Sequence, residues 1–155
     1  MITEEILRAV LGSFFGTIGF TMLVHAPKRA CLVSGGIAVF SYLVYWGLLR
    51  AGLSEPSSVF LGSFLGSLIA MLSARKMKII GTVFLMSVVV PVVPGLALYR
   101  MMAFLGQNRI SDGVALGIHA MITIAMIALG LGAGALTDRI LHTRGRKNLS
   151  GKKTP

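Results

Sequence analysis

Residues 88–95 read Val-Val-Val-Pro-Val-Val-Pro-Gly, and apolar residues continue on both sides of them. The whole run is long enough to cross a membrane, yet it holds two prolines and a glycine in close succession. A proline removes a backbone donor and clashes with the carbonyl four residues earlier, so a regular helix cannot pass through unchanged. Freed backbone groups are costly in hydrocarbon, so a broken helix persists there only where protein or a wet cavity surrounds it. Such breaks often mark the binding site of a transporter; the alternative is a proline kink repaired by its neighbours.

The composition is that of an integral membrane protein. Of the 155 residues, 55% are hydrophobic, and the mean hydropathy is +0.83. These values lie far outside the range of soluble globular domains. The net charge of +10 does not indicate nucleic acid, because the basic residues lie at the ends of apolar runs and not among clustered aromatic residues. The single cysteine, Cys31, excludes an intrachain disulfide.

The apolar segments predict an all-α fold with about five transmembrane helices in one domain, residues 1–141. The segments cover about residues 6–24, 30–49, 59–74, 79–105 and 114–136. Four of them have roughly the 20 residues that cross a bilayer, and the third is a little short unless it starts earlier. The fourth is expected to be broken at its Pro-x-x-Pro-Gly motif. Residues 142–155 form a basic tail that we expect to be disordered.

The distribution of Lys and Arg predicts the orientation. With five spans, one side of the membrane carries eleven of the 15 basic residues: Lys28, Arg29, Arg75, Lys76, Lys78, Arg139, Arg144, Arg146, Lys147, Lys152 and Lys153. The other side carries Arg8, Arg50, Arg100 and Arg109. Because basic loops stay in the cytoplasm, the N-terminus is expected outside and the C-terminus inside.

A short glycine motif occurs twice. Leu11-Gly-Ser-Phe-Phe-Gly16 resembles Leu61-Gly-Ser-Phe-Leu-Gly66, and each copy places two glycines on one helix face. Such faces let helix backbones approach closely, either within one chain or between chains. The repetition is compatible with an internal duplication and does not establish one.

The sequence offers no constellation for catalysis or metal binding. The acids all lie near predicted span ends: Glu4, Glu5, Glu55, Asp112 and Asp138. A His-Glu-x-x-His pair and a Gly-x-Ser-x-Gly elbow are both absent from the sequence. We therefore expect no enzyme activity, no catalytic residue, no metal and no cofactor.

Two ionisable residues fall inside apolar runs. Arg100 follows the break and lies close enough to a span end to reach the interface with its long side chain. His119 lies about two turns into the last span, where it is either a hydrogen-bonded packing residue or a proton relay.

The break itself offers backbone groups to a ligand. About 12 residues of the fourth span precede Pro91 and about 10 follow Gly95, which centres the break in a core roughly 30 Å thick. The first amides of the helix that starts near Gly95, those of Leu96 to Leu98, have no helical partner and suit a carboxylate. Carbonyls ending the preceding half-helix can accept from an ammonium group, and Tyr99 can supply a hydroxyl.

Two stretches resemble a known family. Gly16-Thr-Ile-Gly-Phe-Thr-Met-Leu-Val-His-Ala-Pro-Lys-Arg-Ala30 is similar to the first loop of the threonine/serine exporter (ThrE) family, specifically its YjjB-like C-terminal half. Val90-Pro-Val-Val-Pro-Gly-Leu-Ala-Leu-Tyr99 is similar to the family's Pro-x-x-Pro-Gly segment. The resemblance covers roughly residues 6–141. It implies export of threonine and serine, or of small dicarboxylates such as succinate, by two membrane halves that split members carry on separate chains.

We therefore expect a subunit of a secondary exporter that moves threonine, serine or similar carboxylate-bearing metabolites out across the bacterial inner membrane. The alternatives are a succinate or dicarboxylate exporter subunit, a non-transporting membrane scaffold for a partner chain and, third, an intramembrane enzyme. The expected partners are the substrate, the lipid bilayer, and a complementary exporter half or further copies of the chain, with no nucleic acid. The expected substrate-binding residues are Pro91, Pro94, Gly95, Leu96, Ala97, Leu98 and Tyr99, with Arg100 and His119 as further candidates.

Overall fold

Every element of the chain that the structure describes is a helix. The computed structural model describes residues 2–150, which form six helices and no strand. They are α1 (Ile2–Leu23), α2 (Lys28–Arg50), α3 (Glu55–Met77), α4 (Gly81–Val89), α5 (Gly95–Gly106) and α6 (Ile110–Ser150). Four of them, α1, α2, α3 and α6, are long and apolar enough to cross a membrane, and α5 is a shorter apolar helix. The all-helical class predicted from the sequence is confirmed.

Two helices are longer than the apolar runs that predict them. α3 begins at Glu55 and not near residue 59, because Ser54 is the residue before the helix and Pro56 lies in its first turn, where a missing amide is tolerated. α6 continues to Ser150, although its apolar run ends near residue 136. A helix does not have to end where its hydrophobic stretch ends. α6 therefore covers much of the segment predicted to be a disordered tail, and the rest of that tail, residues 151–155, lies outside the described residues.

The turns that reverse the chain share one hydrogen-bond pattern. Each has a residue with positive φ that donates to the carbonyl three residues back, while the next residue donates to the carbonyl five residues back. This is the Schellman arrangement, which satisfies carbonyls at a helix end. The four positions are His25, Gly52, Lys78 and Asn108. These compact turns make the two helices that each one joins antiparallel neighbours.

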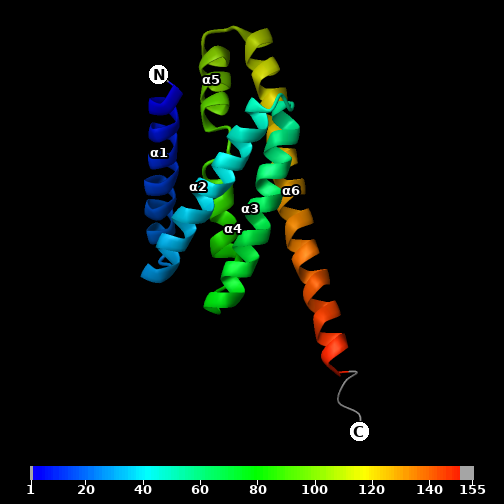
Figure 1. Cartoon of the computed structure of the whole chain (residues 1–155). Helices are drawn as coiled ribbons and strands as arrows, with labels where there is room; N and C mark the ends of the chain where they lie inside the picture. Colours follow the sequence, from blue (N-terminus) through cyan, green and yellow to red (C-terminus); the bar gives the residue numbers. More distant parts are fainter. Residues whose placement is uncertain (1, 151–155) are drawn as a thin grey trace.

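The helices form a bundle with α3 near its centre (Figure 1). α3 packs against α2, α4 and α6, whereas α1 packs mainly against α2, and α5 mainly against α6. α4 and α5 follow one another in the same direction, so together they occupy one passage through the bundle. The described chain thus begins at one end of the bundle and finishes at the other.

The interior is built from small side chains and hydroxyls more than from large apolar groups. Phe84 is the largest fully buried side chain, and many of the others are serines. Two of these serines bond between helices: the Ser41 hydroxyl donates to the Gly62 carbonyl at 3.1 Å, and the Ser67 hydroxyl donates to the Leu131 carbonyl at 3.1 Å. Small residues allow the close helix contacts that such bonds require.

The two copies of the glycine motif serve different surfaces. In α3, a Cβ at Gly66 would stand 2.8 Å from both the Ser41 hydroxyl and a methyl group of Val88, so this copy packs inside the chain. In α1, a Cβ at Gly12 or Gly16 would meet nothing within 4 Å. Only the α1 copy therefore remains open to another molecule.

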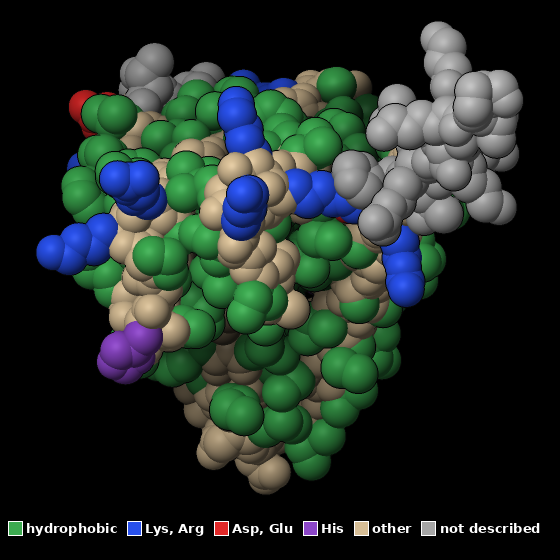
Figure 2. Space-filling view, turned by 90° about the horizontal axis from the view of Figure 1, so that it is seen from below, with side chains coloured by type: hydrophobic (Ala, Val, Ile, Leu, Met, Phe, Trp, Pro, Cys, Tyr) green, Lys and Arg blue, Asp and Glu red, His purple; other side chains and the backbone are tan. Residues whose placement is uncertain are grey.

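The basic residues gather at one end of the bundle (Figure 2). This end contains the turn between α1 and α2, the end of α3 and the later turns of α6. The described basic residues of these segments are Lys28, Arg29, Arg75, Lys76, Lys78 and Arg139. We call this end of the bundle the basic end.

Candidate substrate site at the helix break

The chain leaves the helical path between Val89 and Gly95. The amides of Val92 and Val93 both donate to the carbonyl of Val89, at 3.0 Å each. Pro94 then adopts φ −76° and ψ 55°, and the amide of Gly95 donates to the carbonyl of Val93 at 2.8 Å. These values define an inverse γ-turn centred on Pro94. The turn redirects the backbone immediately before α5 begins.

The two prolines leave specific backbone groups open. A helical residue at 91 would donate to Ser87, and one at 94 would donate to Val90, but proline has no amide hydrogen. On the other side of the break, no backbone carbonyl among the described residues accepts from the amides of Leu96 or Ala97. The amide of Leu98 donates to the carbonyl of Pro94 at 3.1 Å. Two amides are thus open, instead of the three expected from the sequence.

One side of the break is anchored in the bundle. Val92 is buried and packs against Val59 of α3 and Ile127 of α6. The other side faces out of the chain, since Val93, Gly95 and Leu96 are exposed. A Cβ at Gly95 would meet nothing within 4 Å. The open amides therefore begin a helix whose backbone can be approached closely from outside the chain.

The polar candidates on α5 point away from the rest of the chain. Tyr99 shares the face of Gly95, one helical turn further on, and is 70% exposed. Arg100 is also exposed. α5 has no buried residue and contacts α6 through Met101 and Leu105, which lie over Gly117 and Gly113. The outer face of α5 thus carries Gly95 and Tyr99 together.

His119 pairs with an acid that sequence reasoning left out of the site. Its Nε2 lies 3.3 Å from Oε2 of Glu55, the first residue of α3, and both side chains are about half exposed. The sequence predicts for Glu55 only a position near a span end. The signal for the pair is that Glu55 precedes the third apolar segment on the less basic side of the predicted membrane, the side nearer to His119 in the last span.

A second missed pair joins α3 and α6 at the basic end. Arg75 Nη2 lies 2.5 Å from Asp138 Oδ2, and the Asp138 side chain is only 5% exposed. The signal for it is the spacing of Gly130, Gly134 and Asp138, which places all three on one face of α6. Both glycines lie against α3, so the aspartate continues that contact.

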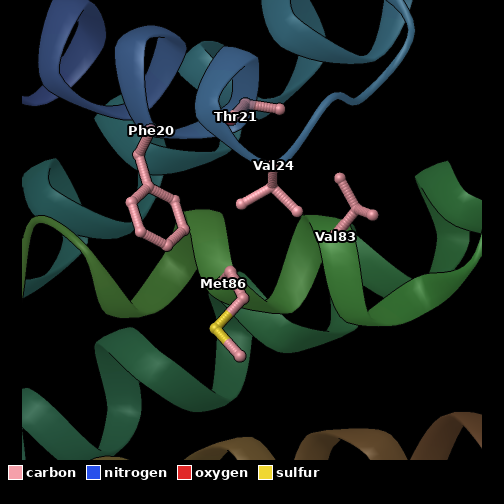
Figure 3. A pocket seen from close by; sticks show the side chains of 5 residues that line it. All are labelled: Phe20, Thr21, Val24, Val83 and Met86. Carbon is pink, nitrogen blue, oxygen red and sulfur yellow. The ribbon is translucent and has the colours of Figure 1, made fainter.

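A pocket lies between the end of α1 and α4 (Figure 3). Phe20, Thr21 and Val24 face Val83 and Met86 across it. The only polar side chain in this lining belongs to Thr21, whose hydroxyl donates to the Thr17 carbonyl at 2.6 Å. The pocket therefore offers a carboxylate neither a cation nor a free side-chain donor, and it does not contain the open amides of the break.

Metal-binding groups do not converge in the described part of the chain. Among the side chains that the structure describes, no three from His, Cys, Asp or Glu lie together in a way that could hold an ion.

The chain's sequence places it among known transport proteins. The threonine/serine exporter (ThrE) family model matches residues 9–136. The chain is also similar to a protein of Mycobacterium tuberculosis (strain ATCC 25618 / H37Rv) named "Probable threonine/serine exporter", with 28% identity over 137 residues. That match covers 88% of this chain and 25% of the relative, so the chain spans about a quarter of the relative's length. No solved structure matches the chain.

These findings define an integral membrane protein of helical type, with four helices of membrane-spanning length among the described residues. The chain belongs to the threonine/serine exporter (ThrE) family. The resemblance found in the sequence is thereby confirmed.

Proposed function

We propose that this chain is one subunit of a secondary exporter that moves threonine and serine out across the bacterial inner membrane. Family membership supports transport. The subunit role rests on the resemblance to split members of the family, which carry the two membrane halves on separate chains. The subunit performs no chemistry on its substrate and needs no cofactor. A complementary exporter half, alone or with further copies of this chain, supplies the rest of the transport path.

The observation that carries the proposal is the pair of open amides at the start of α5. The amides of Leu96 and Ala97 lack backbone acceptors, and Gly95 has no side chain to cover them. The positive end of the helix dipole favours an anion at the same place. A substrate carboxylate binds there, and Tyr99 offers its hydroxyl from the same face of α5. Pro91 and Pro94 act indirectly, because they keep the helix broken.

The proposal includes five crossings, with α4 and α5 together forming the fourth. Arranged in this way, the basic end lies in the cytoplasm, as Lys and Arg in short loops require. The N-terminus then lies outside and the C-terminus inside. A reporter that becomes fluorescent only in the cytoplasm should fluoresce when it is fused after Pro155. A tag placed before Met1 should be accessible from outside the cell. Finding both ends on the same side would contradict the five-crossing arrangement.

The function is tested by efflux of radiolabelled threonine, serine and succinate. Cells should express this chain alone, the complementary chain alone, or both. Gly95→Leu places a branched side chain over the open amides and should reduce threonine efflux at least tenfold. The matched control is Gly106→Leu at the other end of α5, where a Cβ also meets nothing within 4 Å. Gly106→Leu should leave efflux within twofold of the unchanged chain.

The amounts of both variants in the membrane should match that of the unchanged chain. If Gly95→Leu exports threonine normally, the break is not the substrate site. If the two chains together raise the efflux of none of the three compounds, the scaffold alternative replaces the transport proposal. Succinate efflux without threonine efflux would instead identify a dicarboxylate exporter.

A further inference from the structure

Two ion pairs join α3 to α6, and they lie one membrane thickness apart. Arg75 pairs with Asp138 at the basic end, and Glu55 pairs with His119 near the opposite end of the bundle. α3 runs 20 residues from Glu55 to Arg75, and α6 runs 19 residues from His119 to Asp138. At 1.5 Å per residue, each helix covers about 30 Å between the pairs, which is the thickness of the hydrocarbon core of a bilayer.

The helix segments between these levels are suited to lipid. Residues 56–74 of α3 and 120–137 of α6 contain no charged residue and no histidine, and the same is true of residues 30–49 of α2. These segments expose large apolar side chains on all three helices, including Phe40 and Leu43 of α2, Leu65 and Leu72 of α3, and Leu129 and Leu136 of α6. Three helices therefore present apolar bands of nearly equal length.

The turn between α2 and α3 limits the band at the end opposite the basic end. Residues 51–54 form this turn and are all exposed. Lipid-exposed irregular backbone does not occur in hydrocarbon, because no water is present to bond its polar groups. Arg50 precedes the turn, and its guanidinium carbon lies 4.8 Å from the centre of the Trp46 ring. Tryptophan is enriched at the membrane–water interface. The hydrocarbon should therefore end at the level of Glu55 and His119, which we call the far edge.

The helix break lies close to the far edge. Val92 packs in one cluster with Val59 of α3 and Ile127 of α6. Val59 follows Glu55 by four residues, about 6 Å, and Ile127 follows His119 by eight residues, about 12 Å. The corresponding lengths to the ion pair at the basic end are about 24 and 17 Å. From Gly95 onward, α5 continues away from the basic end (Figure 1), so it crosses the far edge.

We propose that lipid hydrocarbon covers the bundle only between the two ion pairs, so that the helix break opens at the far edge of the membrane and not at its midplane. The length of the apolar run alone predicts a centred break, because it does not show how far α5 extends past the turn between α2 and α3. In the proposed five-crossing arrangement, on which the sidedness rests, the far edge faces the outside of the cell. The open amides of Leu96 and Ala97 are then reached from the outside, where an exported substrate leaves.

The depth is tested with Trp46, the single tryptophan of the chain. It lies four residues, about 6 Å, from Arg50. The chain is reconstituted in phosphatidylcholine whose acyl chains carry bromine either near the headgroup or near the terminal methyl. Shallow bromine should quench Trp46 fluorescence at least twofold more than deep bromine.

The matched probe for the midplane is Leu129→Trp in a Trp46→Phe background. Leu129 is 60% exposed and lies about 15 Å along α6 from His119. Deep bromine should quench this tryptophan at least twofold more than shallow bromine, in a variant whose helical circular dichroism is unchanged. A centred break would move the membrane boundary outward and place Trp46 as deep as position 129. Stronger quenching of Trp46 by deep bromine, or equal profiles for the two probes, would overturn the proposal.

The side on which the break opens is tested with a charged thiol reagent that does not cross membranes. Leu96→Cys and Lys76→Cys are made in a Cys31→Ser background and labelled in spheroplasts and in inside-out vesicles. Leu96→Cys should react at least tenfold faster in spheroplasts, and Lys76→Cys, at the basic end, at least tenfold faster in inside-out vesicles. Labelling of Leu96→Cys from the same side as Lys76→Cys, or from neither side, would overturn an opening at the far edge. Exchange of the two sides would instead reverse the proposed orientation and leave the depth of the break standing.

Discussion

At the scale of single residues, the pair of Arg75 and Asp138 makes the clearest prediction about stability. Asp138 is almost completely buried, while Arg75 is partly exposed. Arg75→Met leaves a buried carboxylate without its cation, which should lower the free energy of unfolding by about 3 kcal/mol. The measurement is denaturant unfolding of the purified chain in detergent, followed by its helical circular dichroism.

The control for this prediction is the neighbouring Lys76→Met, which removes an exposed charge and should change the stability by less than about 0.5 kcal/mol. Asp112→Asn breaks an exposed pair and should cost less than about 1 kcal/mol. If Arg75→Met is no more destabilising than these two variants, the buried pair does not hold α3 and α6 together.

At the scale of helices, the contact between α3 and α6 depends on Gly130 and Gly134, which both lie against α3. A Cβ at Gly130 would lie 2.7 Å from the Phe60 carbonyl oxygen, which is backbone and cannot move aside easily. Gly130→Ala should therefore destabilise the chain by about 1–3 kcal/mol, the usual cost of overpacking. Gly132 lies two residues away on the same helix, and a Cβ there meets nothing within 4 Å.

Gly132→Ala is the matched control, because it makes the same chemical change at an open position. It should be neutral or slightly stabilising, since alanine favours a helix over glycine by up to about 1 kcal/mol. Both variants are compared by the same unfolding measurement. Equal stability of the two alanine variants would show that the close approach of α3 and α6 is not required.

The helix break predicts a definite pattern of chemical reactivity. Single cysteines are placed at 92, 93 and 96 in a Cys31→Ser background and treated with a small polar thiol reagent. Positions 93 and 96 are exposed and should react, whereas 92 packs against Val59 and Ile127 and should stay inert. Threonine should protect position 96. A polar reagent does not reach thiols that face lipid, so inert cysteines at 93 and 96 would contradict a wet site.

Removing both prolines should restore the helix. Pro91→Ala with Pro94→Ala returns the amides that can donate to the carbonyls of Ser87 and Val90. The double variant should lose the reactivity of position 96 and most of the threonine efflux. Single substitutions restore only one of the two bonds and should have intermediate effects. Normal transport by the double variant would reduce the break to a simple kink.

The sequence predicts the helices better than it predicts the site. The lengths of the apolar runs are sufficient to locate α1, α2, α3 and α6. A segment that crosses hydrocarbon must satisfy its backbone hydrogen bonds within a helix, and about 20 apolar residues are needed to cross. The break at Pro91 and Pro94 follows from proline chemistry alone. The pairing of Glu55 with His119 cannot be predicted in this way, since it depends on α3 and α6 being neighbours. Likewise, the sequence predicts an open amide at Leu98, but the local turn geometry gives this amide the Pro94 carbonyl as an acceptor.

At the scale of the whole molecule, we expect the proposed complementary exporter half to bind at the open glycine face of α1. Gly12 and Gly16 lie on one face of α1, and a Cβ at either would meet nothing within 4 Å among the described residues. Glycine faces allow close packing of membrane helices, so this face suits a helix of the complementary exporter half. Gly12→Leu with Gly16→Leu should reduce co-purification of the two halves at least fivefold and leave membrane insertion unchanged.

The corresponding change in α3 provides the contrast. Gly66 is enclosed by Ser41 and Val88, so Gly66→Leu should reduce the amount of folded chain instead of its association with a partner. The measurement is co-purification together with native mass spectrometry. If the α1 double variant assembles as well as the unchanged chain, the partner binds elsewhere on the bundle.

The attachment of α5 to α6 has a consequence for how the chain is made. α5 has 12 residues, about 18 Å of helix, which is too short to cross a bilayer alone, and its main contacts are with α6. The ribosome synthesises α5 before α6. α5 therefore lacks its main packing partner until Gly113 and Gly117 of α6 have also been synthesised. In the proposed five-crossing arrangement, membrane integration of the fourth crossing must then wait for the fifth. A nascent chain in which a polar linker long enough to fill the ribosomal tunnel replaces everything after residue 109 should remain at the translocon with α5 accessible to water. A chain that includes α6 before the same linker should release α5 into the bilayer.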